Sequence, residues 1–240
     1  MSDAAAPLPR RAPWLAIGLA ALAAALLLVT IVGDRIEDGA QFAFDKAVLL
    51  TMREPGALGV PEGPAFLKQA MLDVTALGGG TILTLVVALG AGFLLLQRHV
   101  LTALLVLAGG ITGPAAVSVA KQVFGRQRPE VIDHLVEVGS ASFPSGHSAN
   151  SAAVYLTLAL VLVQIVERRA ERVYLLAAAA LLVLAIGASR VYLGVHWPSD
   201  VLAGWAFGAL WAVGWWAIGH WLRARYAPEH GLDATPDRSA

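Results

Sequence analysis

The sequence predicts an all-α protein, a bundle of six transmembrane helices with a short amphipathic external segment between the first two. Hydrophobic residues make up 58% of the 240-residue chain and charged residues only 14%, whereas an ordinary soluble domain carries about 25% charged residues. The charges are also separated by long apolar stretches, and a helix needs about 20 such residues to cross a bilayer. These stretches show no alternation with a period of two, which argues against a barrel.

Six stretches without Asp, Glu, Lys or Arg mark the expected helices in order: 12–33, 74–97, 99–120, 138–166, 173–189 and 201–222. Backbone polar groups in lipid must be satisfied within the chain, which favours helices. Stretch 173–189 is at the short end of the usual range but still long enough to span. The first stretch, Pro13 to Gly33, is longer than the apolar core of a signal peptide, so we interpret it as a retained helix.

The external segment is expected within residues 34–73. Phe44, Val48 and Met52 recur there at helical spacing with charged residues between them. This pattern predicts a short amphipathic helix on the membrane surface. Stretches rich in proline and glycine then break the pattern, and a second short helix is expected near Ala65–Leu72.

Residues 12–225 are expected to form a single membrane domain, flanked by disordered cytoplasmic tails at 1–11 and 226–240. The short loop 167–172 is densely basic, and so are both chain ends. Because cytoplasmic loops carry an excess of Lys and Arg, this distribution places both termini in the cytoplasm of a multi-pass protein of the cell (inner) membrane. The connections between helices 3 and 4 and between helices 5 and 6 then lie on the outer, periplasmic side.

The composition excludes several classes of function. The net charge is zero, which suggests no nucleic-acid partner. The chain has no cysteine, so disulfides, thiol catalysis and cysteine–metal sites are excluded. We expect neither a cofactor nor a metal, and the sequence specifies no oligomeric state.

Three polar clusters lie at the ends of the expected helices. They are KQVFGRQRP at 121–129, PSGH at 144–147 and SRVYLGVHWPSD at 189–200. With six spans, the 3–4 and 5–6 connections must lie on the same side of the membrane. All three clusters are therefore expected at one face.

That face combines groups that bind and transfer phosphate. Lys121, Arg128 and Arg190 supply cations that suit phosphate oxygens. Ser145 and Gly146 offer backbone N–H groups at the start of a helix, where anions are favoured. No group of carboxylates accompanies these cations to hold magnesium, so the chemistry is expected to be metal-free.

His196 and Asp200 are spaced i and i+4, and Pro198 suits the first turn of a helix between them. Asp200 can then accept a hydrogen bond from one ring nitrogen of His196, which leaves the other nitrogen free to attack phosphorus. His147 remains as the general acid for the leaving oxygen and later as the base for water.

The three clusters resemble the signature of the type 2 phosphatidic acid phosphatase (PAP2) superfamily: K-x6-R-P, P-S-G-H and S-R-x5-H-x3-D. The resemblance covers roughly residues 40–220. It implies a phosphohistidine on His196, acid–base catalysis by His147 and orientation of the nucleophile by Asp200. It also implies that phosphate is held by the remaining motif residues: Lys121, Arg128, Ser145, Gly146 and Arg190. Arg126 is an additional cation without an assigned role, and His134 is expected to be solvated.

Taken singly, these residues also have structural interpretations. Basic residues often end membrane helices or extend toward the interface, but the conjunction on one face favours function. The leading hypothesis is a phosphatase acting on undecaprenyl diphosphate, phosphatidylglycerol phosphate or phosphatidate. The alternatives are a phosphotransferase using the same intermediate and a non-enzymatic lipid-phosphate binder or transporter.

Overall fold

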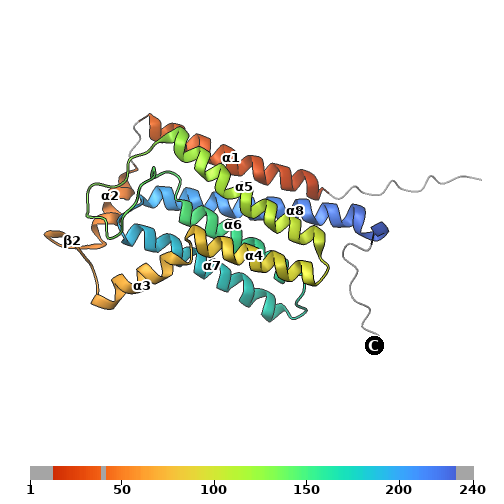
Figure 1. Ribbon diagram of the computed structural model, residues 1–240. Coiled ribbons are helices and arrows are strands. Elements are labelled where there is room, and N and C mark those ends of the chain that lie inside the picture. The colour runs from red at the N-terminus through yellow and green to blue at the C-terminus, as the bar shows by residue number, and fades with distance from the viewer. Residues whose placement is uncertain (1–12, 39–41, 231–240) are drawn as a thin grey trace, which may run out of the picture.

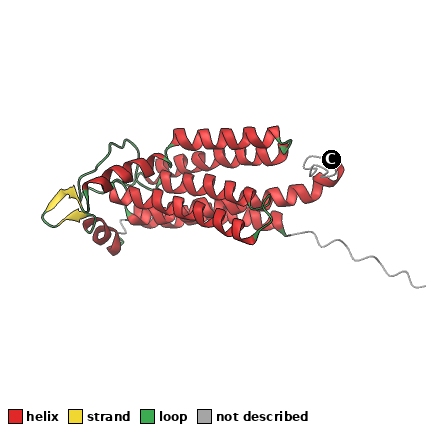
Figure 2. Ribbon diagram, turned by 90° about the horizontal axis from the view of Figure 1, so that it is seen from below, coloured by secondary structure: helices red, strands yellow, loops and turns green. Residues whose placement is uncertain are grey.

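The computed structural model describes residues 13–38 and 42–230. The helices are α1 (Trp14–Glu37), α2 (Ala43–Leu50), α3 (Ala65–Ala76), α4 (Gly80–Leu96), α5 (Val100–Phe124), α6 (Gly146–Leu162), α7 (Arg169–Tyr192) and α8 (Pro198–His230). The strands are β1 (Arg53–Glu54) and β2 (Ala57–Pro61). The long helices run side by side in an elongated bundle (Figures 1 and 2), which confirms the helical membrane-type architecture.

Four described helices are long and apolar enough to cross a membrane: α1, α5, α7 and the part of α8 that ends at Tyr226. Helices α3 and α4 together form a fifth candidate, bent by 47° at the break between them. Helices α4 and α6 have only 17 residues each. By length and composition the structure thus supports four or five spans, and the predicted count of six is not confirmed.

Two uncharged stretches proved longer than the helices they contain. Within 138–166 the helix begins only at Gly146, because residues 138–145 form a loop that ends at Pro144 and the extended residue Ser145. Within 74–97 the chain bends at Gly78 and Gly79. Conversely 173–189, expected to be the short span, is the middle of the 24-residue helix α7. Absence of charge measures compatibility with lipid, and it does not locate helix ends.

The bend between α3 and α4 depends on a glycine. A Cβ atom placed on Gly78 would lie 2.4 Å from Cγ2 of Ile186 on α7. Such a contact is far inside van der Waals distance, so only glycine allows the bend to pack this closely against α7. This packing brings α3 alongside the end of α7 that carries Arg190.

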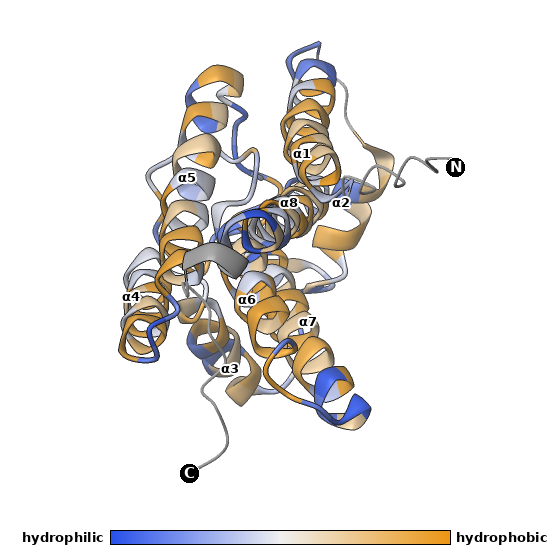
Figure 3. Cartoon of the chain, turned by 90° about the vertical axis from the view of Figure 1, so that its right-hand side faces the viewer, coloured by the Kyte–Doolittle hydropathy of each residue, from blue (hydrophilic) through white to orange (hydrophobic). Residues whose placement is uncertain are grey.

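Helix α8 lies in the middle of the bundle when it is viewed end-on (Figure 3). A Cβ on Gly208 would lie 2.3 Å from the carbonyl oxygen of Ala149, so the backbones of α8 and α6 nearly touch. Phe143, Phe207 and Trp211 pack in the buried core beside this contact. The close approach fixes the start of α6 against the start of α8.

The segment between α1 and α4 contains α2, α3 and a hairpin that the sequence did not predict. Strands β1 and β2 pair antiparallel around Gly56, whose φ of +84° suits glycine. The segment lies at the end of the bundle where α5 ends and α6 begins (Figure 1). The start of α1 and the end of α8 lie at the opposite end.

The expected tails fall largely outside the described residues. The structure describes no part of 1–12 or 231–240. Helix α8 continues to His230 and thus into the segment 226–240 that was expected to be a tail.

Candidate active site

The polar clusters predicted from the sequence meet where four helix ends converge. Lys121 lies in the last turn of α5, Ser145 to His147 begin α6, Arg190 lies in the last turn of α7 and Asp200 lies in the first turn of α8. Arg128 and His196 lie on the intervening loops. His147 is within electrostatic range of the other ionisable groups at the site: Arg190, His196, Lys121 and Arg128. The structure therefore places the candidate residues of all three clusters together.

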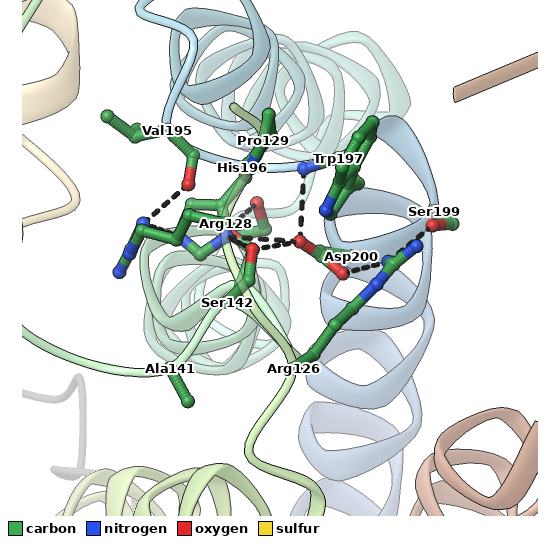
Figure 4. Close-up of polar contacts among 12 residues, drawn as sticks. Arg126, Arg128, Pro129, Ala141, Ser142, Val195, His196, Trp197, Ser199 and Asp200 are labelled. Carbon is green, nitrogen blue, oxygen red and sulfur yellow. Dashed lines mark hydrogen bonds and ion pairs between the residues drawn. The ribbon is translucent and has the colours of Figure 1, made fainter. Parts of the chain in front are cut away.

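His196 and Asp200 form a buried pair, with exposed fractions of 2% and 0%. Nδ1 of His196 lies 3.4 Å from Oδ2 of Asp200, at the long limit of a hydrogen bond. The same oxygen accepts hydrogen bonds from the Ser142 hydroxyl and from the backbone N–H of Trp197, the latter over 3.0 Å (Figure 4). A proton on Nδ1 facing this carboxylate leaves the lone pair on Nε2.

Burial lowers the pKa of His196 to about 4, and the hydrogen bond and charge of Asp200 only partly oppose this effect. The ring is therefore uncharged at neutral pH. A neutral imidazole with its proton on Nδ1 is the form that can act as a nucleophile through Nε2.

Arg128 lies on the Nε2 side of the ring. Its NH1 is 3.4 Å from Nε2 of His196 and donates to the carbonyl oxygen of Val195. Its Nε donates to the carbonyl oxygen of Ser140 over 2.8 Å. These backbone contacts hold the guanidinium within reach of the oxygens of a phosphoryl group bonded to Nε2.

Lys121 and Arg190 complete the cationic part of the site. Nζ of Lys121 donates to the carbonyl oxygens of Ala141 and Ser142. NH1 of Arg190 donates to the Thr75 hydroxyl over 2.9 Å, while its Nε is buried without a hydrogen-bond partner among the described residues. A buried donor of this kind suits an anion, because leaving it unsatisfied is costly.

Ser145 contributes differently from the expectation. Its backbone N–H donates to the carbonyl oxygen of Asp200 over 3.1 Å, and its hydroxyl accepts from Ser148 over 2.9 Å. No side chain caps the start of α6. The N–H groups of the first turn, which begins at Gly146, are thus the backbone donors available to an anion.

Arg126 is distinct from the other cations. Its NH1 pairs with Oδ1 of Asp200 (Figure 4). Its NH2 pairs with Asp45 on α2 over 3.1 Å. His134 is exposed on its loop, and its Nε2 lies 2.7 Å from the carbonyl oxygen of Pro129.

Sequence reasoning missed three of these contributors: Ser142, Thr75 and Asp45. Ser142 lies in an uncharged stretch and belongs to no motif, so no signal pointed to it. Asp45 is one of the charged residues of the predicted amphipathic helix, and its spacing there gives no sign of a role in the site. Each acts across a tertiary contact, and such contacts leave no mark in local spacing.

The chain is similar to a protein family and to several known proteins. The model of the PAP2 superfamily matches residues 99–224. Phosphatidylglycerophosphatase B of Bacillus subtilis (strain 168) is 34% identical over 189 residues, 77% of this chain and 86% of the relative. Decaprenylphosphoryl-5-phosphoribose phosphatase of Mycolicibacterium smegmatis is 37% identical over 100 residues, 40% of this chain and 49% of the relative.

Two solved structures share the fold. The transmembrane PAP2-type phosphatidylglycerolphosphate phosphatase from Bacillus subtilis matches with a TM-score of 0.64 and 29% identity, covering 81% of this chain and 91% of its own. LpxE from Aquifex aeolicus matches with a TM-score of 0.53 and 24% identity, over 72% and 94% of the two chains, which is a likeness of fold alone.

Proposed function

This chain belongs to the PAP2 superfamily of membrane phosphatases, and on that premise we propose that it hydrolyses a lipid phosphate or diphosphate through a phosphohistidine at His196. The observation that carries the proposal is the buried pair of His196 and Asp200, with Arg128 beside the free ring nitrogen. Binding alone needs no oriented nucleophile, so this pair favours an enzyme over a lipid-phosphate binder or transporter.

In the first step, Nε2 of His196 attacks phosphorus and forms a P–N bond while the bond to the lipid oxygen breaks. His147 donates a proton to that departing oxygen. The phosphorylated ring is cationic and keeps its proton on Nδ1, where the charge of Asp200 stabilises it.

In the second step, water attacks phosphorus and the P–N bond breaks. His147, which lost its proton in the first step, accepts one from the water. Free phosphate leaves and His196 returns to its neutral form. The products are the lipid alcohol, or the lipid monophosphate when the substrate is a diphosphate, together with inorganic phosphate.

Charge on the phosphoryl oxygens is stabilised by Lys121, Arg128, Arg190 and the N–H groups at Gly146. The unpartnered Nε of Arg190 supports this assignment. These donors are fixed by the protein before the reaction begins, which is the arrangement that lowers the barrier most.

We also propose that the reaction requires no metal. The site gathers cations, and among the described residues no three His, Asp or Glu side chains group as metal ligands. Arginine and lysine can then neutralise the phosphate charge themselves.

The candidate substrates are phosphatidylglycerol phosphate, undecaprenyl diphosphate and phosphatidate. The relative from Bacillus subtilis, named phosphatidylglycerophosphatase B, supports the first.

For topology, we propose six crossings in which α4 and α6 both traverse the bilayer. At 17 residues each they reach the lower limit of about 17–25 residues. The site then lies on the outer face.

The test is phosphate release by the purified protein in detergent from a panel of these three lipids, with and without a chelator. We expect release from at least one lipid, no effect of the chelator and inhibition by vanadate. Activity that is lost with the chelator and restored by magnesium would contradict the proposed chemistry. Transfer of phosphate to an added alcohol in place of water would identify a phosphotransferase.

A further inference from the structure

Arg126 joins two buried carboxylates on different helices. Its NH1 pairs with Asp200 on α8 and donates to the Ser199 hydroxyl over 2.8 Å. Its NH2 pairs with Asp45 on α2 over 3.1 Å, and its guanidinium lies 5.4 Å from the centre of the Trp197 ring. Both terminal nitrogens are thus directed at protein groups. This is unlike Arg190, whose buried Nε has no partner among the residues described.

Asp45 belongs to the external segment, outside the region that the family model matches. It is only 3% exposed. It accepts two hydrogen bonds from Ser199, over 2.8 Å from the backbone N–H and over 2.6 Å from the hydroxyl. Asp45 therefore holds both Arg126 and the first turn of α8, in which Asp200 lies.

The two oxygens of Asp200 have separate partners. Oδ2 faces His196, Ser142 and the backbone N–H of Trp197, whereas Oδ1 is held by Arg126. The contact with Arg126 fixes the rotation of the carboxylate, and it also shares the negative charge that would otherwise act on His196 alone. Partners of this kind orient catalytic groups without touching the substrate.

From this geometry we propose that Arg126 and Asp45 are positioning residues, which hold Asp200 and through it orient His196 for attack. The inference rests on the proposed phosphohistidine reaction. It assigns Arg126 to the nucleophile and not to the phosphate, and it couples the external helix α2 to the reaction.

The test compares Arg126→Gln, Arg126→Lys and Asp45→Asn with two control variants in the purified protein. Lys46→Gln is the control for Asp45, because Lys46 is the exposed neighbour on the same helix, and Gln127→Ala is the control for Arg126. We expect Arg126→Gln to lower kcat by about 10–100-fold, the usual effect of losing an orienting partner. KM and the inhibition constant of inorganic phosphate, which binds the anion site without forming a bond to His196, should stay unchanged. Arg126→Lys should recover part of kcat, and the controls should match the wild type.

Two further measurements separate positioning from a general effect on folding. Because both residues act on Asp200, the loss of kcat in the double variant Arg126→Gln/Asp45→Asn should be smaller than the product of the two single losses. The charged and titratable groups that act on His196 are Asp200, Arg128, Lys121 and His147. Removing Arg126 leaves more of the Asp200 charge to stabilise the imidazolium, so the acid limb of kcat/KM should move to higher pH.

Three results would overturn the inference. An inhibition constant of inorganic phosphate that rises together with KM in Arg126→Gln would make Arg126 a phosphate ligand. Wild-type kcat in Arg126→Gln, or strictly multiplicative losses in the double variant, would remove its link to the nucleophile. If Arg126→Gln does not fold, the same comparison of kcat, KM and phosphate inhibition is made with Arg126→Lys and Asp45→Asn. Failure of the proposed function would look different from failure of this inference, because the wild-type protein itself would then release no phosphate.

Discussion

At the scale of single residues, the two ring nitrogens of His196 face different partners. Nδ1 lies against Asp200 and Ser142, and Nε2 lies against Arg128. This asymmetry favours a proton on Nδ1 and, in the proposed reaction, attack through Nε2. The surroundings of the ring also determine the pH at which His196 becomes protonated.

The acid limb of kcat/KM is expected well below the ordinary titration range of histidine. Burial lowers the pKa of His196 to about 4, so the ring becomes protonated, and inactive as a nucleophile, only as the pH falls through that value. The measurement is kcat/KM against pH, corrected for ionisation of the substrate phosphate. An acid limb that belongs to the enzyme and has its midpoint near pH 6.5 would contradict the lowered pKa of His196.

Asp200→Asn is expected to reduce the plateau of activity without moving the acid limb upward. The carboxylate raises the pKa of His196, so its removal lowers that pKa further. At the same time the Nδ1 proton is no longer enforced, and attack slows by an expected factor of up to about 10⁴. The conservative control is Asp133→Asn, an exposed carboxylate on the loop before α6. An acid limb that shifts to higher pH in Asp200→Asn would be inconsistent with this account.

Much of the candidate site could be predicted because its residues belong to motifs at helix ends. The spacing of His196 and Asp200 predicts their contact within one helical turn, and topology predicts that the motifs share a face. The bridge from Arg126 to Asp45 could not be predicted this way. Arg126 and Asp45 are 81 positions apart in the chain, and Asp45 and Ser199 are 154 apart. Nothing in local spacing specifies such contacts.

At the scale of elements, the bend between α3 and α4 is the feature that most directly shapes the site. It packs Gly78 against Ile186 and His147, and it brings Thr75 within hydrogen-bond distance of Arg190. Tyr155 on α6 donates to the carbonyl oxygen of Leu77 over 2.7 Å and holds the bend from the other side. The bend that interrupts the predicted span at Gly78 thus also contacts residues of the site.

Gly78→Ala is expected to destabilise the protein by about 1–3 kcal/mol, the usual cost of overpacking, and to lower activity. The new Cβ would lie 2.4 Å from Cγ2 of Ile186 and push α3 away from α7. Thermal unfolding in detergent measures the loss. Gly92→Ala on α4, where a Cβ meets nothing within 4 Å, is the matched control. Partial recovery in Gly78→Ala/Ile186→Ala would support the contact, whereas a silent Gly78→Ala would refute it.

The hairpin shows why some elements escape sequence prediction. Strand β1 has two residues and β2 ends at a proline, so neither carries a readable pattern. The hairpin is held by Arg53, a buried side chain that donates to the carbonyl oxygens of Tyr192 and Asp133. Its stability therefore comes from α7 and from the loop before α6.

At the scale of the whole molecule, the site and the described chain ends lie at opposite ends of the bundle (Figure 1). Six described arginines lie at the end away from the site, on the loop before α5, around the start of α7 and near the end of α8: Arg98, Arg168, Arg169, Arg172, Arg223 and Arg225. The proposed outward-facing site rests on the dense basic run at 168–172, because cytoplasmic loops are rich in Lys and Arg.

Single cysteines test this orientation cleanly, because the natural chain has none. Gly139→Cys lies on the exposed loop before α6, and Arg169→Cys lies at the start of α7. An impermeant thiol reagent added to intact cells should label the first and should label the second only after permeabilisation. The reverse pattern would place the site in the cytoplasm.

The most direct test of the central claim is rapid-quench trapping of protein-bound phosphate from a labelled lipid substrate. Wild type should trap phosphate on histidine, and His196→Ala should trap none. His147→Ala should still form the phosphoenzyme when the leaving group is a good one, such as an acidic phenol, because general acid catalysis worth about 10²–10⁴-fold then matters least. If His196→Ala still traps phosphate while His147→Ala traps none, with no dependence on the leaving group, His196 is not the nucleophile.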